Sequence, residues 1–288
     1  MKGDEIRRAV RDRYGAIAAT QLADEPATVV KEESSCGCSP SCCSPEATDV
    51  SFDDVAKGIG YDESEVGGVP EGANMGLGCG NPIALASLAP GETVLDLGSG
   101  GGFDCFLSAE RVGASGSVIG VDMTPDMIEL SRQNAVKGGY ENVEFRLGEI
   151  EALPVADESV DAIISNCVIN LSADPERVFR EAFRVLKPGG RLMISDLVSE
   201  HAIPAVLTEN PDAFVTCLPV QRDVYLNRLR EAGFDRVEVV QEDSFATDHL
   251  AADSSIGQLL TSAGLAREVI DRFSDGMRSA KISATKAG

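Results

Sequence analysis

Thiols are the side chains of this sequence with the strongest potential for chemistry. The 288-residue chain holds eight cysteines. Its N-terminus lacks the apolar segment of a secretion signal, so we expect a cytoplasmic protein, in which structural disulfides rarely persist. Thiolates bind soft, thiophilic metals and metalloids, and they exchange with disulfides. Cys105 is an exception, because it lies beside Phe103 and Phe106 in a helical pattern and is predicted to be a small buried residue.

A glycine-rich turn follows a strongly apolar segment. Residues 93–102 read TVLDLGSGGG, a predicted buried strand that runs into a turn before a helical pattern. Glycines at such a turn let the backbone approach a ligand closely, and the turn by itself would also suit a dinucleotide. Asp96, however, would repel a pyrophosphate, whereas it suits the amine and the sulfonium of S-adenosylmethionine. The pattern Asp-x-Gly-x-Gly, which includes Gly98 and Gly100, resembles that of S-adenosylmethionine-dependent methyltransferases.

Two later segments carry acids where the ribose and the adenine of such a cofactor would lie. Asp122 and Met123 end the next predicted strand, about 20 residues after the turn, where an acid typically receives the two ribose hydroxyls. Residues 146–154 read RLGEIEALP and resemble the methyltransferase segment that meets the adenine edge. We expect Glu149 to accept the exocyclic amine and Ile150 to lie beside it. The order of the three segments favours a methyltransferase.

Asn166 and Cys167 follow the fourth predicted strand. Ligands of an open parallel sheet bind outside the carboxyl ends of the strands, so these side chains should lie where a transferred methyl group would be. A methyltransferase that acts on oxygen or nitrogen often benefits from a base at this position. This sequence has a thiol there instead, and its two histidines, His201 and His249, lie in polar stretches.

Four segments together closely resemble arsenite S-adenosylmethionine methyltransferases. They are residues 76–82 (GLGCGNP), 96–106, 120–125 (GVDMTP) and 165–171 (SNCVINL). The resemblance covers roughly residues 52–240. Its specific part is the pair of motifs around Cys79 and Cys167, because many methyltransferases share the glycine-rich turn.

The resemblance implies that three thiolates bind trivalent arsenic. Cys79 and Cys167 match the motifs of the family, and Cys217 is the natural third ligand, although Pro219 follows it where the family usually has a Gly-Ala-Leu type run. Three sulfurs complete a pyramid around arsenic and leave its lone pair exposed as the nucleophile. The implied substrates are arsenite and then methylarsenite, with S-adenosylmethionine as methyl donor and a thioredoxin-like protein or glutathione as reductant. We also expect reversible disulfides between turnovers.

Four further cysteines lie in a segment, residues 24–50, that is rich in Ser, Pro, Glu and Ala and has no apolar periodicity. Cys42 and Cys43, together with Cys36 and Cys38, could capture arsenic and pass it inward. Alternatively, one of them could be the resolving thiol that the family places near its N-terminus. A loose metal-binding tail with no catalytic part is a third alternative.

The elements that must position these residues form an α/β pattern. After Pro90, short apolar runs alternate with amphipathic stretches, which is typical of βαβ units and a parallel sheet. The predicted strands are 93–97, 118–122, 143–147, 160–165, 191–195, 237–240 and 280–285, and the predicted helices are 1–20, 103–112, 125–137, 175–186 and 222–232. The glycine-rich stretch 52–82 is predicted to be an ordered loop that serves as a lid.

The resemblance implies a Rossmann-like class I methyltransferase, a three-layer α/β sandwich with a seven-strand core. We expect a smaller C-terminal region and an N-terminal thiol-rich extension beside this core. The predicted parts are a helix and a flexible segment at 1–50, the cofactor-binding core at 51–200, and an arsenic-site region with the last strands at 201–288.

Charge and hydropathy exclude several classes of partner. The formal charge is −22, and such a field repels a phosphate backbone, so a general nucleic-acid binder is excluded. The acidic surface suits either a salt-rich cytoplasm or an ordinary acidic enzyme. No apolar run approaches the roughly 20 residues of a membrane helix. We expect a monomer.

Two other function classes stay open. A carbon methyltransferase of quinone-type or other small-molecule metabolism would share the cofactor core but would leave Cys79 and Cys167 unexplained. A thiol-based protein that sequesters or senses metalloids would explain the cysteines, but it would need neither Asp96 nor Asp122.

Overall fold

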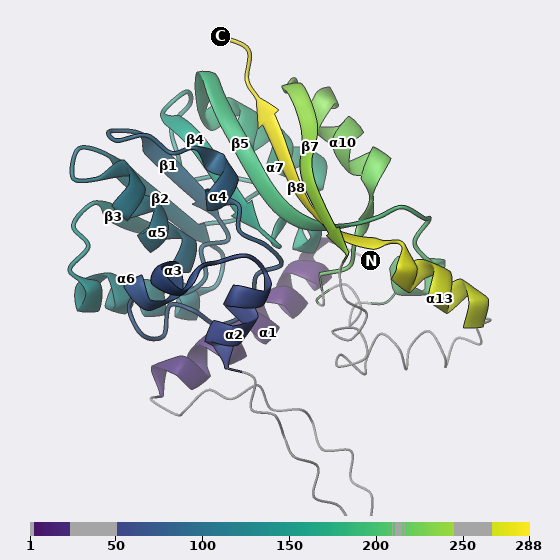
Figure 1. The fold of residues 1–288 in the computed structure, drawn as a ribbon, viewed down its shortest axis with the longest axis horizontal. Helices are drawn as coiled ribbons and strands as arrows, with labels where there is room; N and C mark the ends of the chain where they lie inside the picture. The colour runs from purple at the N-terminus through teal and green to yellow at the C-terminus, as the bar shows by residue number, and fades with distance from the viewer. Residues whose placement is uncertain (1–2, 24–50, 209, 211–214, 216, 245–266) are drawn as a thin grey trace, which may run out of the picture.

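A central sheet with helices on both faces organises the chain (Figure 1). The computed structural model describes residues 3–23, 51–208, 210, 215, 217–244 and 267–288. The strand order is β3-β2-β1-β4-β5-β8-β7, and the two-residue strand β6 (Val220–Gln221) pairs with β5 outside this path. β1 to β5 are parallel, whereas β8 runs antiparallel between β5 and β7.

All seven predicted strands are present. They are β1 (Thr93–Leu97), β2 (Ser117–Asp122), β3 (Val143–Leu147), β4 (Val160–Asn166), β5 (Leu186–Ser199), β7 (Asp235–Ser244) and β8 (Met277–Thr285). β1, β4 and β5 are buried along most of their length, as expected of central strands that helices cover on both faces.

Two helical layers bury apolar side chains against the sheet. The helices are α4 (Ile83–Ala86), α5 (Phe103–Val112), α6 (Pro125–Gly138), α7 (Pro175–Val185) and α10 (Arg222–Glu231). In one layer Phe179 packs edge-on against Tyr225, with ring centroids 5.4 Å apart. In the other, Phe106 packs edge-on against Phe145, with centroids 5.9 Å apart. Each of these rings contributes about 1.5 to 3 kcal/mol by burial, so the two faces hold the strands in fixed register.

The prediction of a loop over 52–82 is wrong for its first half. Two short helices lie there, α2 (Phe52–Gly58) and α3 (Glu63–Gly68). Both begin with a capping box, made by Ser51 with Asp54 and by Asp62 with Glu65. These reciprocal hydrogen bonds satisfy the free N–H groups at the helix starts. They stabilise the helices despite the low helix propensity of the nearby glycines.

β5 is also longer than the predicted strand at 191–195. The segment Pro188-Gly189-Gly190 indicates a turn, yet Leu186 pairs with Val160 of β4, and residues 191–199 pair with β8. Between these pairs the register with β4 shifts, so residues 187–190 form an irregular bulge, with Gly189 at a φ of 80°, and the strand resumes after it.

Further helices lie around the carboxyl ends of the strands. They are α1 (Gly3–Leu22), the 3-10 helix η1 (Ile169–Leu171), α8 (Ala205–Thr208) and α13 (Arg267–Asp275). α13 lies in a stretch where the sequence predicted no element. Its apolar residues Val269, Ile270 and Phe273 form a stripe too short to stand out by periodicity.

The last strands, β7 and β8, belong to the central sheet. The boundaries at residues 50 and 200 stay predictions. The N-terminal cysteines, including Cys42 and Cys43, lie outside the described residues. In the described part of the chain, no helix is both long and apolar enough to cross a membrane.

Candidate active site

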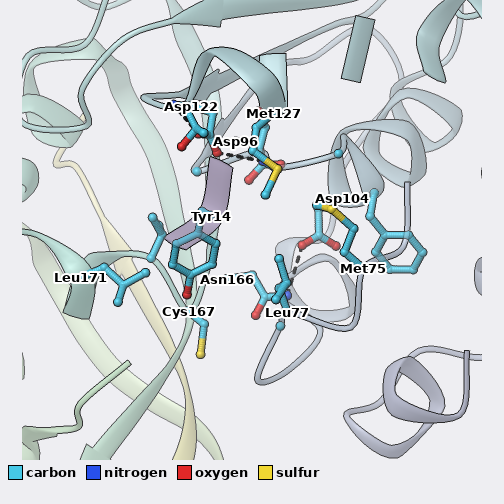
Figure 2. Close-up of a pocket in the computed structure, with 18 of the residues that line it drawn as sticks. Tyr14, Met75, Leu77, Asp96, Asp104, Asp122, Met127, Asn166, Cys167 and Leu171 are labelled. Carbon is cyan, nitrogen blue, oxygen red and sulfur yellow. Dashed lines mark hydrogen bonds between the residues drawn. The ribbon is translucent and has the colours of Figure 1, made fainter. Parts of the chain in front are cut away.

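A cavity opens at the carboxyl ends of β1, β2 and β4 (Figure 2). Asp96 and Asp122 lie at one end of it in this view, and Cys167 lies at the other. The topology creates this arrangement because β1 sits between β2 and β4, where the chain reverses its direction across the sheet. All of the predicted cofactor residues except Glu149, together with one predicted thiol, therefore line one cavity.

The glycine-rich turn after β1 forms part of the wall. Gly98 and Gly100 have φ values of 69° and 50°, which side chains rarely adopt. A Cβ on Gly98 would lie 2.5 Å from Cγ2 of Val168. Ser99 Oγ is buried in the same wall with no hydrogen-bond partner among the described residues. A polar ligand fits this surface, since it can approach the bare backbone and satisfy the hydroxyl.

Asp122 faces the cavity with a firmly held carboxylate. One oxygen accepts a hydrogen bond from Gly100 N at 3.0 Å, and the other accepts one from Thr124 N at 2.8 Å. Burial raises the pKa of this carboxyl group above its ordinary value, while the backbone donors oppose the shift. Each oxygen keeps a further lone pair for a ligand. This geometry fits the predicted contact with two ribose hydroxyls.

Two more carboxyl groups, Asp96 and Asp104, line the same cavity. Burial raises the pKa of both, that of Asp104 to about 6. Cys105 Sγ donates to Asp96 at 3.2 Å, and Tyr61 Oη donates to Asp104 at 2.6 Å. A bound cation would offset the cost of burying these acids, so the ammonium and sulfonium groups of S-adenosylmethionine fit this end. Cys105 is buried, as the sequence predicted.

The segment after β3 supplies the next part of the wall. Met123 and Ile150 line the cavity, but Glu149 does not. Its carboxylate lies 3.4 Å from Nε of Arg7 on α1. Glu151, the next acid, lines the cavity and was missed by the sequence analysis. Contact of Glu149 with an adenine amine stays a prediction, and the geometry offers Glu151 as a second acceptor.

Helix α1 covers one side of the cavity with Val10 and Tyr14. Burial raises the pKa of the Tyr14 hydroxyl. The sequence predicted this helix from its spacing of apolar residues. Periodicity does not reveal where an amphipathic helix docks, so the part of Tyr14 in the cavity was missed.

The three predicted arsenic ligands lie near one another at the other end of the cavity, although only Cys167 lines it. Cys79 and Cys167 form a disulfide, with Cα atoms 5.8 Å apart. Cys217 Sγ donates to the carbonyl oxygen of Cys167 at 3.2 Å. Cys167 and Cys217 have φ values of 57° and 59°, a sparsely populated region that folded proteins often retain at functional sites. Their role as arsenic ligands and the reversibility of the disulfide stay predictions.

Asn166, predicted to contact the cofactor, is occupied mainly with the chain around Cys79. Its side-chain oxygen accepts from Cys79 N at 3.0 Å, and its Nδ2 donates to Gly80 O at 2.7 Å. The same nitrogen lies 3.2 Å from Asp104 Oδ2 (Figure 2). Asn166 therefore joins the two ends of the cavity.

Asp196 is a buried acid at the thiol site that the sequence analysis missed. One of its oxygens lies within 4.8 Å of the sulfurs of Cys79 and Cys167. Tyr225 Oη donates to it at 3.1 Å, and Cys217 Sγ lies 3.8 Å away. Burial raises the pKa of Asp196 to about 7, and burial together with this acid raises the pKa of the Cys217 thiol. The site therefore favours a protonated Cys217 before a ligand arrives.

We expect Asp196→Asn to stabilise the protein more at about pH 8 than at about pH 5. The folded protein holds the Asp196 proton up to a pKa of about 7, whereas the unfolded chain releases it near the ordinary value of 3.8. As pH rises through this window, the native state retains a proton that the unfolded state has lost, so wild-type stability falls. Asparagine removes this dependence. Urea unfolding of both proteins at the two pH values measures the difference, and an equal difference at both would contradict the expectation.

Comparison with known protein families identifies the family of this chain. The family model described as a methyltransferase domain matches residues 88–233, just over half of the chain. The chain belongs to this methyltransferase family. The matched residues of the methyltransferase include the glycine-rich turn, Asp122 and Cys167.

Among known proteins, the chain is similar to several arsenite methyltransferases. The methyltransferase is 49% identical to an arsenite methyltransferase of Halobacterium salinarum over 90% of this chain and 66% of that protein. It is 39% identical to an arsenite methyltransferase of Aquipseudomonas alcaligenes over 65% of this chain and 56% of that protein. The crystal structure of an arsenic(III) S-adenosylmethionine methyltransferase from Chlamydomonas reinhardtii matches with a TM-score of 0.58 and 32% identity, over 73% of this chain and 67% of that one.

These matches confirm the resemblance to arsenite methyltransferases and the expected Rossmann-like class I fold. The chain spans 66% and 56% of the lengths of the two sequence relatives. What those longer proteins do as a whole is therefore a proposal for this chain.

Proposed function

We propose that the protein transfers methyl groups from S-adenosylmethionine to trivalent arsenic held by Cys79, Cys167 and Cys217. One observation carries the proposal. Cys167 lines the cavity of the glycine-rich turn and is at the same time bonded to Cys79, with Cys217 beside it. A thiol cluster beside a cofactor cavity can hold a methyl acceptor next to the methyl group of the cofactor.

The cofactor half of the cavity supports S-adenosylmethionine. Asp96 and Asp104 would face its cationic groups, Asp122 its ribose, and Ile150 its adenine. When bound, the cofactor supplies a methyl group on a sulfonium, which is ready to accept an electron pair. The residues of the chain orient it, since the carboxylate of Asp122 is fixed by two backbone N–H groups.

The thiol half would act first by exchange and then by ligation. Two equivalents of a thiol, from a thioredoxin-like protein or glutathione, reduce the disulfide of Cys79 and Cys167 to two thiols and leave as one disulfide. Three thiols then replace the three hydroxyl groups of arsenite, and the three protons leave in three molecules of water. Soft sulfur ligands favour this exchange. The protonated state of Cys217 matches this stoichiometry.

Apolar side chains around the thiols would keep water from the bound arsenic. Leu207, Leu218, Phe273 and Met277 are buried in one cluster with Cys79 and Cys167. Exclusion of water would protect the As–S bonds from hydrolysis. Because the wall is apolar, methylarsenite, which carries one methyl group, is also expected as a substrate. Dependence on free thiols supports a reducing, cytoplasmic location.

The decisive experiment measures S-adenosylhomocysteine release from reduced protein, with cofactor and glutathione, in the presence and absence of arsenite. Low and high salt are compared, because the self-repulsion of a chain with a net charge of −22 is screened at high ionic strength. Arsenite-dependent release is the expected result.

Two other outcomes would redirect the proposal. Cofactor binding with no arsenite-dependent release would point to another acceptor, such as a quinone-type carbon. Arsenite binding without cofactor binding would favour a protein that sequesters or senses the metalloid.

A further inference from the structure

The loop that carries Cys79 contacts side chains of three strands, β4, β5 and β8. Its flanking residues, Gly78 and Gly80, leave no room for side chains: a Cβ on Gly78 would lie 2.7 Å from Asn166 Nδ2, and one on Gly80 would collide with Ser195 Oγ. Side chains of β4 and β5 thus touch the backbone of this loop directly. The position of the Cys79 thiol depends on what holds that backbone.

Two strands fix the main chain of Cys79 itself. Asn166, at the end of β4, accepts from its N–H at 3.0 Å. Ser279, on β8, donates from Oγ to its carbonyl oxygen at 2.6 Å, across a sequence separation of 200 residues. Ser279 is 7% exposed, so water competes little for this bond. With both groups engaged, the peptide of Cys79 is held from two sides.

The place of Ser279 in the sheet makes its hydroxyl a precise anchor. β8 lies between β5 and β7, and Ser279 pairs with Leu197 on one side and with Asp243 on the other. Leu197 follows Asp196, the acid at the thiol site. The bond from Ser279 therefore ties the Cys79 loop to the same part of the sheet that positions Asp196.

We propose that Ser279 is a positioning residue that keeps the Cys79 thiol next to the Cys167 thiol after the disulfide is reduced. The reduced pair is then preorganised, either to re-form the disulfide or to close around one arsenic atom. Closure around arsenic rests on the proposed function, whereas re-formation of the disulfide does not. The hydroxyl of Ser279 touches neither arsenic nor cofactor in this scheme and acts through Cys79.

The test compares Ser279→Val with Ser279→Thr, which have nearly the same shape and differ in the hydroxyl. Ser283→Ala, four residues along the same face of β8, is the control for altering the strand. The first readout is the glutathione equilibrium, in which the disulfide of Cys79 and Cys167 plus two glutathiones gives two thiols plus glutathione disulfide. The second is arsenite affinity of the reduced protein, and the third is S-adenosylhomocysteine affinity, which reports an intact core.

Loss of one buried hydrogen bond should shift the glutathione equilibrium of Ser279→Val toward the dithiol by about three- to tenfold. Arsenite affinity should fall by a similar factor with cofactor affinity unchanged, and Ser279→Thr and Ser283→Ala should resemble the wild type. Equal equilibria in the Val and Thr variants would overturn the proposal. If the reduced wild type binds no arsenite, the proposed function fails, but the glutathione equilibrium still decides the role of Ser279.

Discussion

Replacing Cys167 by serine is expected to abolish arsenite-dependent release of S-adenosylhomocysteine while cofactor binding persists. Serine occupies nearly the same space, but its hydroxyl is a hard ligand that stays protonated at neutral pH and cannot replace a thiolate on arsenic. Only Cys79 and Cys217 would then remain, and two sulfurs neither complete the pyramid nor aim the lone pair at the cavity. Cofactor affinity should change little, because the proposed cofactor contacts, Asp96, Asp122 and the glycine-rich turn, lie on or directly after β1 and β2.

Cys105→Ser is the matched control for this experiment. Cys105 is buried as Cys167 is, but its thiol is free, and a serine hydroxyl can keep the hydrogen bond that Cys105 donates to Asp96. This variant should retain turnover in excess reductant. Arsenite-dependent release that survives in Cys167→Ser would remove Cys167 from the mechanism.

Replacing Asp122 by alanine is expected to weaken cofactor binding by about 1 to 3 kcal/mol, which is roughly five- to 150-fold. The carboxylate would face the ribose hydroxyls, and it also accepts hydrogen bonds from Gly100 N and Thr124 N. Its removal leaves both the ligand and the glycine-rich turn without their acceptor. Calorimetric titration with S-adenosylhomocysteine measures the loss.

Glu129→Ala provides the comparison for Asp122→Ala. Glu129 is an exposed acid on α6, outside the cavity, so the variant changes the net charge equally without touching the site. It should bind the cofactor as the wild type does. Unchanged affinity in Asp122→Ala would refute the ribose contact, and equal weakening in both variants would point to charge alone.

Local sequence predicted most elements of the core because local signals and tertiary packing agree there. Strands β1 and β3 begin and end at the residues that the sequence predicted, and α5 starts directly after the glycine-rich turn. The predictions fail where local signals and tertiary packing disagree. Gly189 and its neighbours indicate a turn, and the register with β4 shifts there, yet β5 pairs with β4 on both sides of these residues and with β8 after them.

The candidate site was predictable to different degrees at its two ends. Asp96 and Asp122 follow from a short motif, because strand, turn and helix are contiguous in the chain. Glu151 and Tyr14 line the same cavity but carry no motif of their own. An acid in a turn and a tyrosine on an amphipathic helix are common, so only the docking of α1 and the path of the chain after β3 reveal them.

The sequence by itself determined the cofactor motif, the order of the strands along the chain and the cysteines that distinguish this methyltransferase. These properties depend on residue type and on spacing within one or two elements. The tertiary structure decided that Cys79 meets Cys167 across 88 residues, that Asp196 lies beside both, and that Ser279 holds Cys79 from a strand 200 residues away. Such contacts arise from strand order and from the burial of each face of the sheet, and these are set by the packing of the whole chain rather than by any local pattern.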